Sequence, residues 1–299
     1  KTRGFWRNKK FFEQEVQKAI NQNGGKWPGS GWIKLNKPGL ATEIYKNYGG
    51  IRKFNKERGF NGYTDYKRAN KNFEKWSPKL AYLMGLIVTD GHLSKPKTRG
   101  YSCFKISIGL SEKDKKILYD IHKWLGLSNT IYVAEPSKKH GKINGRSIIT
   151  RHNCYVLNIH GKAPYLFAKK AGIATKHKSH RQGILKIPDK YFAHFLRGAI
   201  DGDGSVTHGA YNIVKDGQKL SLSIHLYGTH KFLLFVKKKI EKILFKNQIS
   251  LNIYPSKTIF VLVLSGKRAE KLRNWIYKEA NENFFFPRKR NKAFFKNES

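Results

Sequence analysis

Acidic residues, sulfur-containing residues and long apolar runs are all scarce in this chain of 299 residues. Its two cysteines, Cys103 and Cys154, form no C-x-x-C pair, which argues against a zinc site or a disulfide framework and fits a reducing compartment. The apolar run from Ile259 to Leu264 is far too short to span a bilayer. The basic amino-terminal stretch lacks the apolar segment of a secretory signal. Disulfide-rich, zinc-finger and membrane-spanning classes are therefore disfavoured.

The shortage of acid leaves a large positive charge. Lys and Arg number 60 and Asp and Glu 20, so the formal net charge is +40 at pH 7. A field of that size indicates a polyanionic partner, and nucleic acid is the commonest one. A membrane surface is the alternative, but membrane binding usually relies on one basic amphipathic helix or one juxtamembrane cluster. Here the charge is spread from Lys1 to Lys296, which favours nucleic acid.

The chain can still bury a core, because 39% of its residues are hydrophobic and 13% are aromatic. Its length suits two or three domains. Residues 1–76 differ from the rest in their tryptophans and glycine pairs, and the spacing of Phe11, Phe12, Val16, Ala19 and Ile20 predicts a helix. We predict a small, basic, mainly helical module there. It is either an extra DNA-binding unit of helix-turn-helix type or an extension that only packs on the main body.

Two acidic segments that end in Asp-Gly recur 113 residues apart (203 minus 90). The first reads LMGLIVTDG from Leu83 to Gly91, and the second reads LRGAIDGDG from Leu196 to Gly204. Each segment predicts a helix with a carboxylate at its carboxyl end, closed by a glycine in a left-handed cap. A carboxylate is unfavourable there, because this end of a helix is already its negative pole. We therefore expect a positive charge to compensate a pair of such sites.

From Ser77 onward the chain divides into two similar halves, residues 77–183 and 184–287, followed by a basic tail at residues 288–299. Helices of the first half are expected at 77–90, 111–125 and 163–171, with strands at 104–110, 130–134 and 155–160. Helices of the second half are expected at 188–203, 230–244 and 267–277, with strands at 220–227, 251–254 and 259–264. Residues 135–153 form a basic insertion in the first half. The repeated order indicates a duplicated unit of helices and strands.

The acidic segments resemble the LAGLIDADG motif of homing endonucleases and their maturase relatives. In register, Thr89 matches Gly202 and Asp90 matches Asp203, and the resemblance covers residues 77–289. One such nonapeptide is a weak signal, whereas two in matching halves of a strongly basic chain are a strong one. The resemblance implies an α+β fold with two pseudo-symmetric αββαββα halves and saddle-like antiparallel sheets. It also implies a monomer, since both halves are fused in a single chain.

Small residues four positions apart in each segment predict that the two helices pack closely. These residues are Gly85 and Thr89 in the first segment and Gly198 and Gly202 in the second. Such a crossing would bring Asp90 and Asp203 together, where their charges repel. Mg²⁺ supplies the missing charge, since it takes oxygen ligands and is often held by one or two carboxylates with substrate phosphates. Mn²⁺ or Ca²⁺ can occupy the same sites, and a metal so placed can activate water for phosphodiester cleavage.

Further site residues rest on the resemblance alone, and they are the metal-binding Thr89 and Gly202 and the catalytic Glu112, Lys162 and Lys267. The first two would supply backbone carbonyls to metal. The third would order water, and the two lysines would neutralise phosphate, although each lysine suits a solvated helix start equally well. The second half has Gly228 where the first has Glu112, which predicts unequal cutting centres. Asp201 matches Val88 rather than an acid, so we interpret it as structural.

Strand alternation predicts which face of each sheet meets nucleic acid. Residues 220–227 alternate strictly between leucine or isoleucine and polar or aromatic residues, as in a half-buried strand. A twisted ribbon with such a polar face can enter the DNA major groove, although an ordinary solvated face alternates in the same way. The predicted DNA-binding residues are Lys105, Ser107, Lys142, Arg146, Ser221, Ser223, His225, Tyr227, Arg288, Lys289 and Arg290. The last three follow a run of phenylalanines and are predicted to form a phosphate clamp.

These features together predict a metal-dependent endonuclease that cuts both strands of a long, non-palindromic DNA site. Two alternatives stay open. One is an RNA maturase on the same fold, which would bind intron RNA, and the other is a DNA-binding relative without catalysis. The presence of both Asp90 and Asp203 favours the nuclease, because a maturase need not retain them.

Overall fold

The computed structural model describes residues 6, 8–25, 27–60, 70–98, 101–127, 129–134, 141–143, 146–148, 153–175, 181–210, 220–280 and 284–294. The chain forms two compact units, residues 1–66 and residues 67–299. Phe73 and Trp76 pack edge-on against Phe167 of the second unit, so the unit boundary lies before residue 76. Both cysteines are free. Within the described ranges, no helix combines the length and the apolar character needed to cross a membrane.

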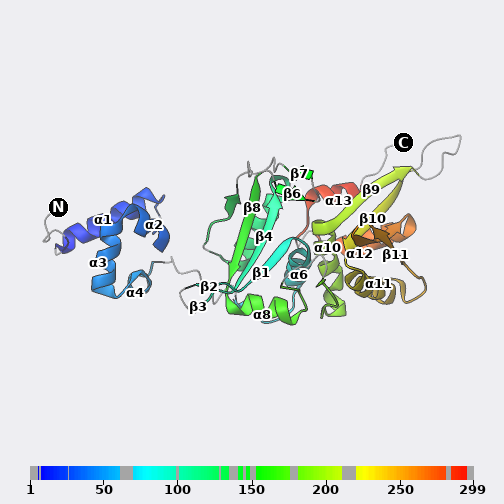
Figure 1. Ribbon diagram of the computed structural model, residues 1–299, viewed down its shortest axis with the longest axis horizontal. Helices are drawn as coiled ribbons and strands as arrows, with labels where there is room; N and C mark the ends of the chain where they lie inside the picture. Colours follow the sequence, from blue (N-terminus) through cyan, green and yellow to red (C-terminus); the bar gives the residue numbers. More distant parts are fainter. Residues whose placement is uncertain are drawn as a thin grey trace. The chain divides into compact units, whose positions relative to one another are not determined.

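The first unit is helical, as predicted (Figure 1). Its described helices are α1 (Lys9–Gln22), α2 (Ser30–Asn36), α3 (Pro38–Tyr48) and α4 (Ile51–Glu57). The Asn8 side chain caps α1 by accepting hydrogen bonds from the first-turn amides, and α3 ends at Gly49 with φ 67°. Apolar side chains from all four helices form a core of their own, which contains Phe12, Val16, Ala19, Ile33, Leu40, Ala41, Ile44, Ile51 and Phe54. The unit therefore has the interior of an independent domain.

The first half of the second unit begins with helix α6 and contains one four-stranded sheet. Its elements are α6 (Pro78–Asp90), β1 (Gly91–Ser94), β4 (Lys105–Ser111), the 3-10 turn η2 (Glu112–Asp114), α7 (Lys115–Leu125), β5 (Tyr132–Ala134), β8 (Cys154–His160) and α8 (Lys162–Lys170). Two short ribbons, β2 (Lys97–Thr98) with β3 (Tyr101–Ser102) and β6 (Gly141–Ile143) with β7 (Arg146–Ile148), lie in its insertions. Its sheet is antiparallel in the order β1-β4-β8-β5.

The second half repeats this arrangement. Its elements are η3 (Asp189–Tyr191), α10 (Phe192–Asp203), β9 (Gly204–Ala210), β10 (Leu220–Gly228), α11 (His230–Phe245), β11 (Asn252–Ser256), β12 (Ile259–Ser265) and α12 (Lys267–Tyr277), followed by α13 (Pro287–Ala293). The antiparallel order β9-β10-β12-β11 matches that of the first sheet strand for strand. The predicted α+β fold with two similar halves is therefore confirmed.

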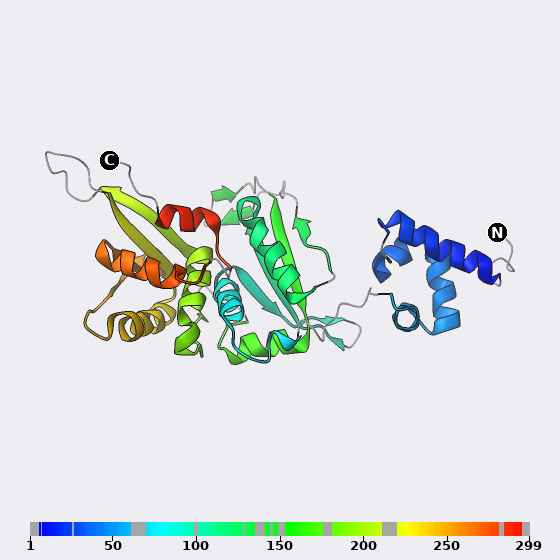
Figure 2. The same ribbon diagram turned by 180° about the vertical axis from the view of Figure 1, so that it is seen from behind.

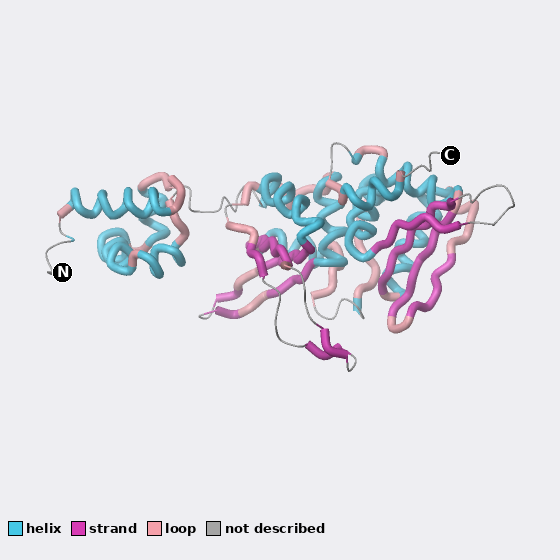
Figure 3. Tube along the Cα trace, turned by 90° about the horizontal axis from the view of Figure 1, so that it is seen from above, coloured by secondary structure: helices cyan, strands magenta, loops and turns pink. Residues whose placement is uncertain are grey.

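Each sheet has one buried and one open face. Along β10, Leu222, Ile224 and Leu226 are at most 3% exposed, and the residues between them are half-buried. Burial alternates in the same way along β4 and β8. In Figure 3 the helices of the second unit gather on one side and the strands of both sheets on the other. The helices thus cover the apolar faces, and the two open faces look away from them.

The prediction of left-handed glycine caps on the two motif helices was wrong. Gly91 and Gly204 have φ values of −87° and −91° and start strands β1 and β9 directly. Glycine is still required there, because an added Cβ at Gly91 would lie 2.6 Å from the carbonyl oxygen of Ile87. At Gly204 the corresponding distance to the Ile200 oxygen would be 2.5 Å. Close approach to the preceding helical turn, and not a positive φ, explains both glycines.

Candidate functional site

Helices α6 and α10 pack against each other at the centre of the second unit (Figure 2). A Cβ added at Gly85 would lie 2.1 Å from the carbonyl oxygen of Phe195. One added at Gly198 would lie 2.2 Å from the carbonyl oxygen of Tyr82. No side chain fits into distances of this kind, so the two backbones touch because both positions are glycine.

The same contact brings the carboxyl ends of the two helices together. A Cβ at Gly202 would lie 1.9 Å from Thr89 Oγ1 and 2.4 Å from Asp90 Oδ2, so the Asp90 side chain lies directly against α10. Thr89 Oγ1 is also 3.2 Å from Asp90 Oδ2, which fixes this carboxylate from its own helix. Asp90 is half-buried, and Asp203, which follows Gly202, is exposed. The duplicated motif therefore places one acidic residue from each half at a common point.

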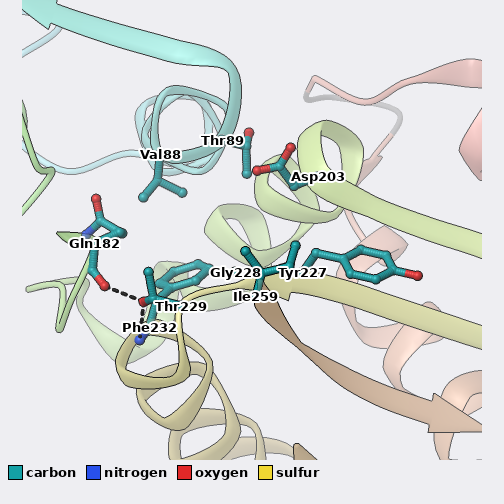
Figure 4. Close-up of a pocket in the computed structure, with 9 residues that line it drawn as sticks. All are labelled: Val88, Thr89, Gln182, Asp203, Tyr227, Gly228, Thr229, Phe232 and Ile259. Carbon is teal, nitrogen blue, oxygen red and sulfur yellow. Dashed lines mark hydrogen bonds between the residues drawn. The ribbon is translucent and has the colours of Figure 1, made fainter. Parts of the chain in front are cut away.

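A cavity of about 550 Å³ opens beside this point. Figure 4 shows Thr89 and Asp203 entering it from two different helices, and Gln182 and Thr229 joined by a hydrogen bond on its far side. Its lining comes from both halves and consists of Val88, Thr89, Gln182, Asp203, Tyr227, Gly228, Thr229, Phe232 and Ile259. The motif carboxylate of the second half is thus accessible from solvent.

Lys289 compensates the negative end of α10. Its side chain is buried, with 5% of the residue exposed, and its ammonium donates to the carbonyl oxygens of Ile200 (2.7 Å) and Gly204 (2.8 Å). The carbonyl oxygens of Asp201 (2.5 Å) and Gly202 (3.2 Å) also lie within reach. Burial lowers the pKa of Lys289 to about 8, while the nearby Asp201 carboxyl group favours the charged form. The positive charge expected at this helix end is therefore supplied, at least in part, by the chain itself.

Asp201 is fully buried and belongs to the packing of the two halves. Its Oδ2 accepts hydrogen bonds from the Tyr82 hydroxyl on α6 and from the Phe286 amide, both at 2.8 Å. Burial raises its pKa to about 7, although both hydrogen bonds favour the ionised form. Because it joins α6, α10 and the carboxyl-terminal segment and faces no solvent, the structural interpretation of Asp201 agrees with its surroundings.

Glu112 and Gly228 lie at the same ends of their sheets as the two motif carboxylates. Gly91 pairs with Ile108 on β4, and the strand then continues toward Glu112, past the end of α6. The Glu112 carboxylate is 3.1 Å from Lys115 Nζ and is largely exposed. Gly228 lines the cavity, and a Cβ there would lie 2.8 Å from a ring carbon of Phe232. The predicted match of Gly228 with Glu112 is nevertheless wrong by strand register. Because Gly91 pairs with Ile108 and Gly204 pairs with Leu226, Gly228 matches Leu110, and the residue that matches Glu112 is His230.

The structure does not bring Lys162 or Lys267 to the acidic pair. In the first sheet Gly91 lies opposite Ile108, and Ile108 lies opposite Leu157, five residues before Lys162. In the second sheet, Gly204 is level with Leu262, five residues before Lys267. The strand residues after Leu157 and Leu262 already span roughly 10 Å before β8 ends at His160 and β12 ends at Ser265, so both lysines lie beyond the far ends of these strands. Sequence alone could not show this, because the register depends on non-local strand pairing.

The predicted DNA-contacting residues of the strands lie on the open faces, and Ser107, Ser223 and His225 among them already make hydrogen bonds within the sheet. Ser107 Oγ donates to Asn158 Oδ1 at 2.7 Å, and Ser223 Oγ lies 2.8 Å from His225 Nε2. Burial lowers the pKa of His225, so the imidazole is neutral at neutral pH. The remaining members of this face are Lys105, Ser221 and Tyr227, all half-buried. The side chains of Lys142 and Arg146 lie outside the described residues.

The structure gives the first two residues of the predicted phosphate clamp, 288–290, partners within the chain itself. Arg288 makes a two-point ion pair with Asp114 of the first half, at 2.7 Å and 2.8 Å. Lys289 is buried on the end of α10, as described above. Arg290 lies over the Phe285 ring with 5.0 Å from its guanidinium carbon to the ring centre. Sequence reasoning missed these roles because the partners of Lys289 are main-chain oxygens 85 to 89 residues away, which leave no side-chain pattern.

The donors at the paired helix ends are oxygen atoms. They are the carboxylates of Asp90 and Asp203, the Thr89 hydroxyl and the neighbouring main-chain carbonyls. Such a set fits Mg²⁺, which keeps several waters and needs only one or two carboxylates when substrate phosphates complete its shell. Within the described part of the chain, no group of three or more His, Cys, Asp or Glu side chains gathers to hold a metal. A metal at this point would therefore be held by the carboxylate pair and main-chain oxygens.

Comparison with known proteins agrees with the predicted resemblance. Residues 77–163 match the family model described as a LAGLIDADG-like domain. The resemblance is thereby confirmed, and the first half carries a LAGLIDADG-like domain. Among curated proteins, none matches the chain.

Several solved structures are similar to this chain. The homing endonuclease I-WcaI bound to its DNA recognition sequence has 17% identity and a TM-score of 0.48, covering 77% of this chain and 92% of its own. Mesophilic variants of the homing endonuclease I-DmoI have 15% identity and a TM-score of 0.43, covering 73% and 98%. The LAGLIDADG meganuclease I-AabMI bound to uncleaved DNA has 14% identity and a TM-score of 0.41, covering 69% and 84%.

Proposed function

We propose that this protein is a site-specific DNA endonuclease that cuts both strands of a long, non-palindromic target with the help of a divalent metal. The observation that carries the proposal is the meeting of Asp90 and Asp203, one from each half, at the ends of two helices that touch through glycine. A charge of +40 and a LAGLIDADG-like domain at residues 77–163 support a DNA substrate. The two halves differ in sequence, so neither half-site needs to mirror the other.

Asp90 and Asp203 would hold the metal, together with the carbonyl oxygen of Thr89 and the phosphates of the DNA. A divalent ion at this place lowers the pKa of bound water and stabilises the leaving oxygen of a phosphodiester. The chain's own part is to fix the two carboxylates, through Gly202 and the Thr89 hydroxyl. Glu112 would orient water in the first half, whereas the matching place in the second half, counted along the paired strands, holds His230.

The open faces of the two sheets would lie along the DNA on either side of the carboxylates. Lys105, Ser221 and Tyr227 would contact the groove, since they lie on those faces and remain half-exposed. Ser107, Ser223 and His225 would contact bases only after giving up the bonds that hold them now.

Cleavage of a library of long DNA duplexes with Mg²⁺ tests this proposal. Asp90→Asn and Asp203→Asn should each reduce double-strand cutting on the order of a hundredfold or more, because each removes a metal ligand worth several kcal/mol in the transition state. Asp120→Asn is the matched control, since Asp120 is a half-buried carboxylate on α7 that makes an ion pair with Lys116. If both motif variants cut as well as the control, the assignment of the acidic pair is wrong.

Two other outcomes identify the alternatives. Tight binding to one DNA site without cutting in any metal would indicate an inactive DNA-binding relative. Preference for intron RNA over DNA of the same sequence at matched salt would indicate a maturase. Either outcome is compatible with the fold described above, and either one contradicts the proposed nuclease activity.

A further inference from the structure

The buried ammonium group of Lys289 lies next to the proposed metal site of the second half. The Lys289 ammonium lies on the carboxyl end of α10, within 3.2 Å of the Gly202 carbonyl oxygen. Gly202 directly precedes Asp203, so this oxygen belongs to the set from which a metal held by Asp203 would draw its ligands. An ammonium and a divalent ion compete for the same negative helix end.

The neighbouring residues hold Lys289 in this position. Arg288 is tied to Asp114 by a two-point ion pair, and the Phe286 amide donates to Asp201 Oδ2 at 2.8 Å. Phe286 is 1% exposed, so the chain before Lys289 is packed into the core. Lys289 is therefore anchored on its amino-terminal side and bonded to α10 through its own side chain. It does not have the freedom of a surface lysine.

We propose that Lys289 is a built-in counter-ion and positioning residue of the second site. It holds the end of α10, and with it Asp203, in place without metal, and by binding the Gly202 carbonyl it weakens divalent metal binding in the second half. This inference rests on the proposed function in one respect, namely that Asp203 binds a divalent ion. It goes beyond that function because it assigns a role to a residue outside both motif segments.

Two effects of opposite sign follow when the charge is removed. Lys289→Met leaves several buried carbonyl oxygens without their donor, so the protein should unfold at a lower temperature in a chelator. The same change makes the helix end more negative and frees the Gly202 carbonyl, so Ca²⁺ should bind about tenfold more tightly. If Lys289 had only a structural role, its substitution would lower the stability of the protein and would not raise its affinity for Ca²⁺.

The experiment measures thermal unfolding of the full chain without DNA, in a chelator and across a Ca²⁺ titration. Wild type, Lys289→Met and Lys289→Gln are compared, since Gln keeps a hydrogen-bond donor and gives a second neutral variant if Met does not fold. Lys292→Met is the matched control, because Lys292 is an exposed lysine on the same helix, α13. The Lys289 variants should show half-maximal Ca²⁺ stabilisation at about one-tenth of the wild-type concentration. Adding Asp203→Asn should abolish this gain.

The inference is overturned if Ca²⁺ raises the unfolding temperature of the neutral Lys289 variants at no lower concentration than it does for wild type. It is equally overturned if Ca²⁺ raises the unfolding temperature of neither wild type nor the variants. It is also overturned if the gain survives Asp203→Asn, because the metal then binds elsewhere. DNA cleavage by wild type in Mg²⁺ is measured separately. A wild-type protein that cuts DNA while its Lys289 variants show no gain would retain the proposed function and lose this role for Lys289.

Discussion

The buried cationic side chains Arg197 and Lys289 of the second half donate mainly to main-chain carbonyls. Arg197, which is fully buried on α10, donates to the carbonyl oxygens of Phe284 (2.8 Å) and Ile276 and faces His194 Nδ1 at 3.1 Å. In this arrangement the imidazole nitrogen must accept, so His194 has to be neutral. Burial, together with the charge of Arg197, lowers the pKa of His194 below its ordinary value of 6.5.

Because His194 is neutral in the folded chain, we expect the free energy of unfolding to decrease in mild acid. Because the pKa of His194 is lower in the folded chain than in the unfolded one, the unfolded chain binds the extra proton first as the pH falls below 6.5. The contribution is therefore complete above pH 6.5 and lost below it. His194→Asn keeps an acceptor for Arg197 and cannot titrate, so urea unfolding between pH 7 and pH 5 should show a weaker pH dependence for this variant. The exposed His92→Asn should retain the wild-type dependence, and equal slopes for all three proteins would contradict the prediction.

Among the elements, the crossing of α6 and α10 carries the strictest steric requirement. Gly85→Ala would place a Cβ within the backbone of α10, and this clash can be relieved only if the two helices move apart. We expect a loss of more than about 3 kcal/mol, at the upper end of overpacking effects. Gly31→Ala on α2 is the matched control, because its Cβ would meet nothing within 4 Å. That change should be neutral or stabilise by roughly 0.5–1 kcal/mol, and denaturant unfolding of both variants measures the difference.

Local sequence patterns predicted the helices well and the short edge strands poorly. The end of α7 at the left-handed Gly126 follows from periodicity and capping, which are local. Strand β1 has only four residues, and Val206 is the buried apolar side chain among the positions of β9 whose burial is described, so neither segment is long or apolar enough to be recognised as a strand. Both exist because they pair with β4 and β10, a non-local effect. The carboxylate pair was predictable from the repeat, whereas the Lys289 contact depends on tertiary placement.

The carboxyl-terminal segment is part of the core rather than a tail. Phe284 packs edge-on against Tyr82 and Trp124 of the first half, and Phe286 is fully buried. A chain that ends at residue 283 should therefore lose cooperative unfolding in the second unit, because it loses this packing and the amide bonded to Asp201. A chain that ends at residue 294 is the control and should unfold like the full chain. Calorimetric unfolding of both chains tests this, and a cooperative transition for the shorter one would refute it.

For the whole molecule, the distribution of charge between the two units sets how DNA binding depends on salt. Residues 1–66 contain 14 Lys or Arg and 5 Asp or Glu, and their core is separate from that of the second unit. Each phosphate that a protein neutralises adds about −0.9 to the slope of log K against log salt concentration. If the first unit contacts DNA, its removal must make the slope shallower without changing the cleavage site.

We therefore expect the chain of residues 67–299 to cut the same site as the full chain, with a salt slope less negative by roughly 3 or more. Retained cleavage shows that the shortened chain is folded, so the slope then reports lost phosphate contacts rather than lost structure. Binding is measured with Ca²⁺ in place of Mg²⁺ over a range of salt concentrations. Equal slopes would mean that residues 1–66 do not touch DNA, and their role would then be confined to interactions other than phosphate neutralisation. A flat response for both chains would contradict a nucleic-acid partner altogether, because a protein of charge +40 cannot bind DNA without releasing counterions.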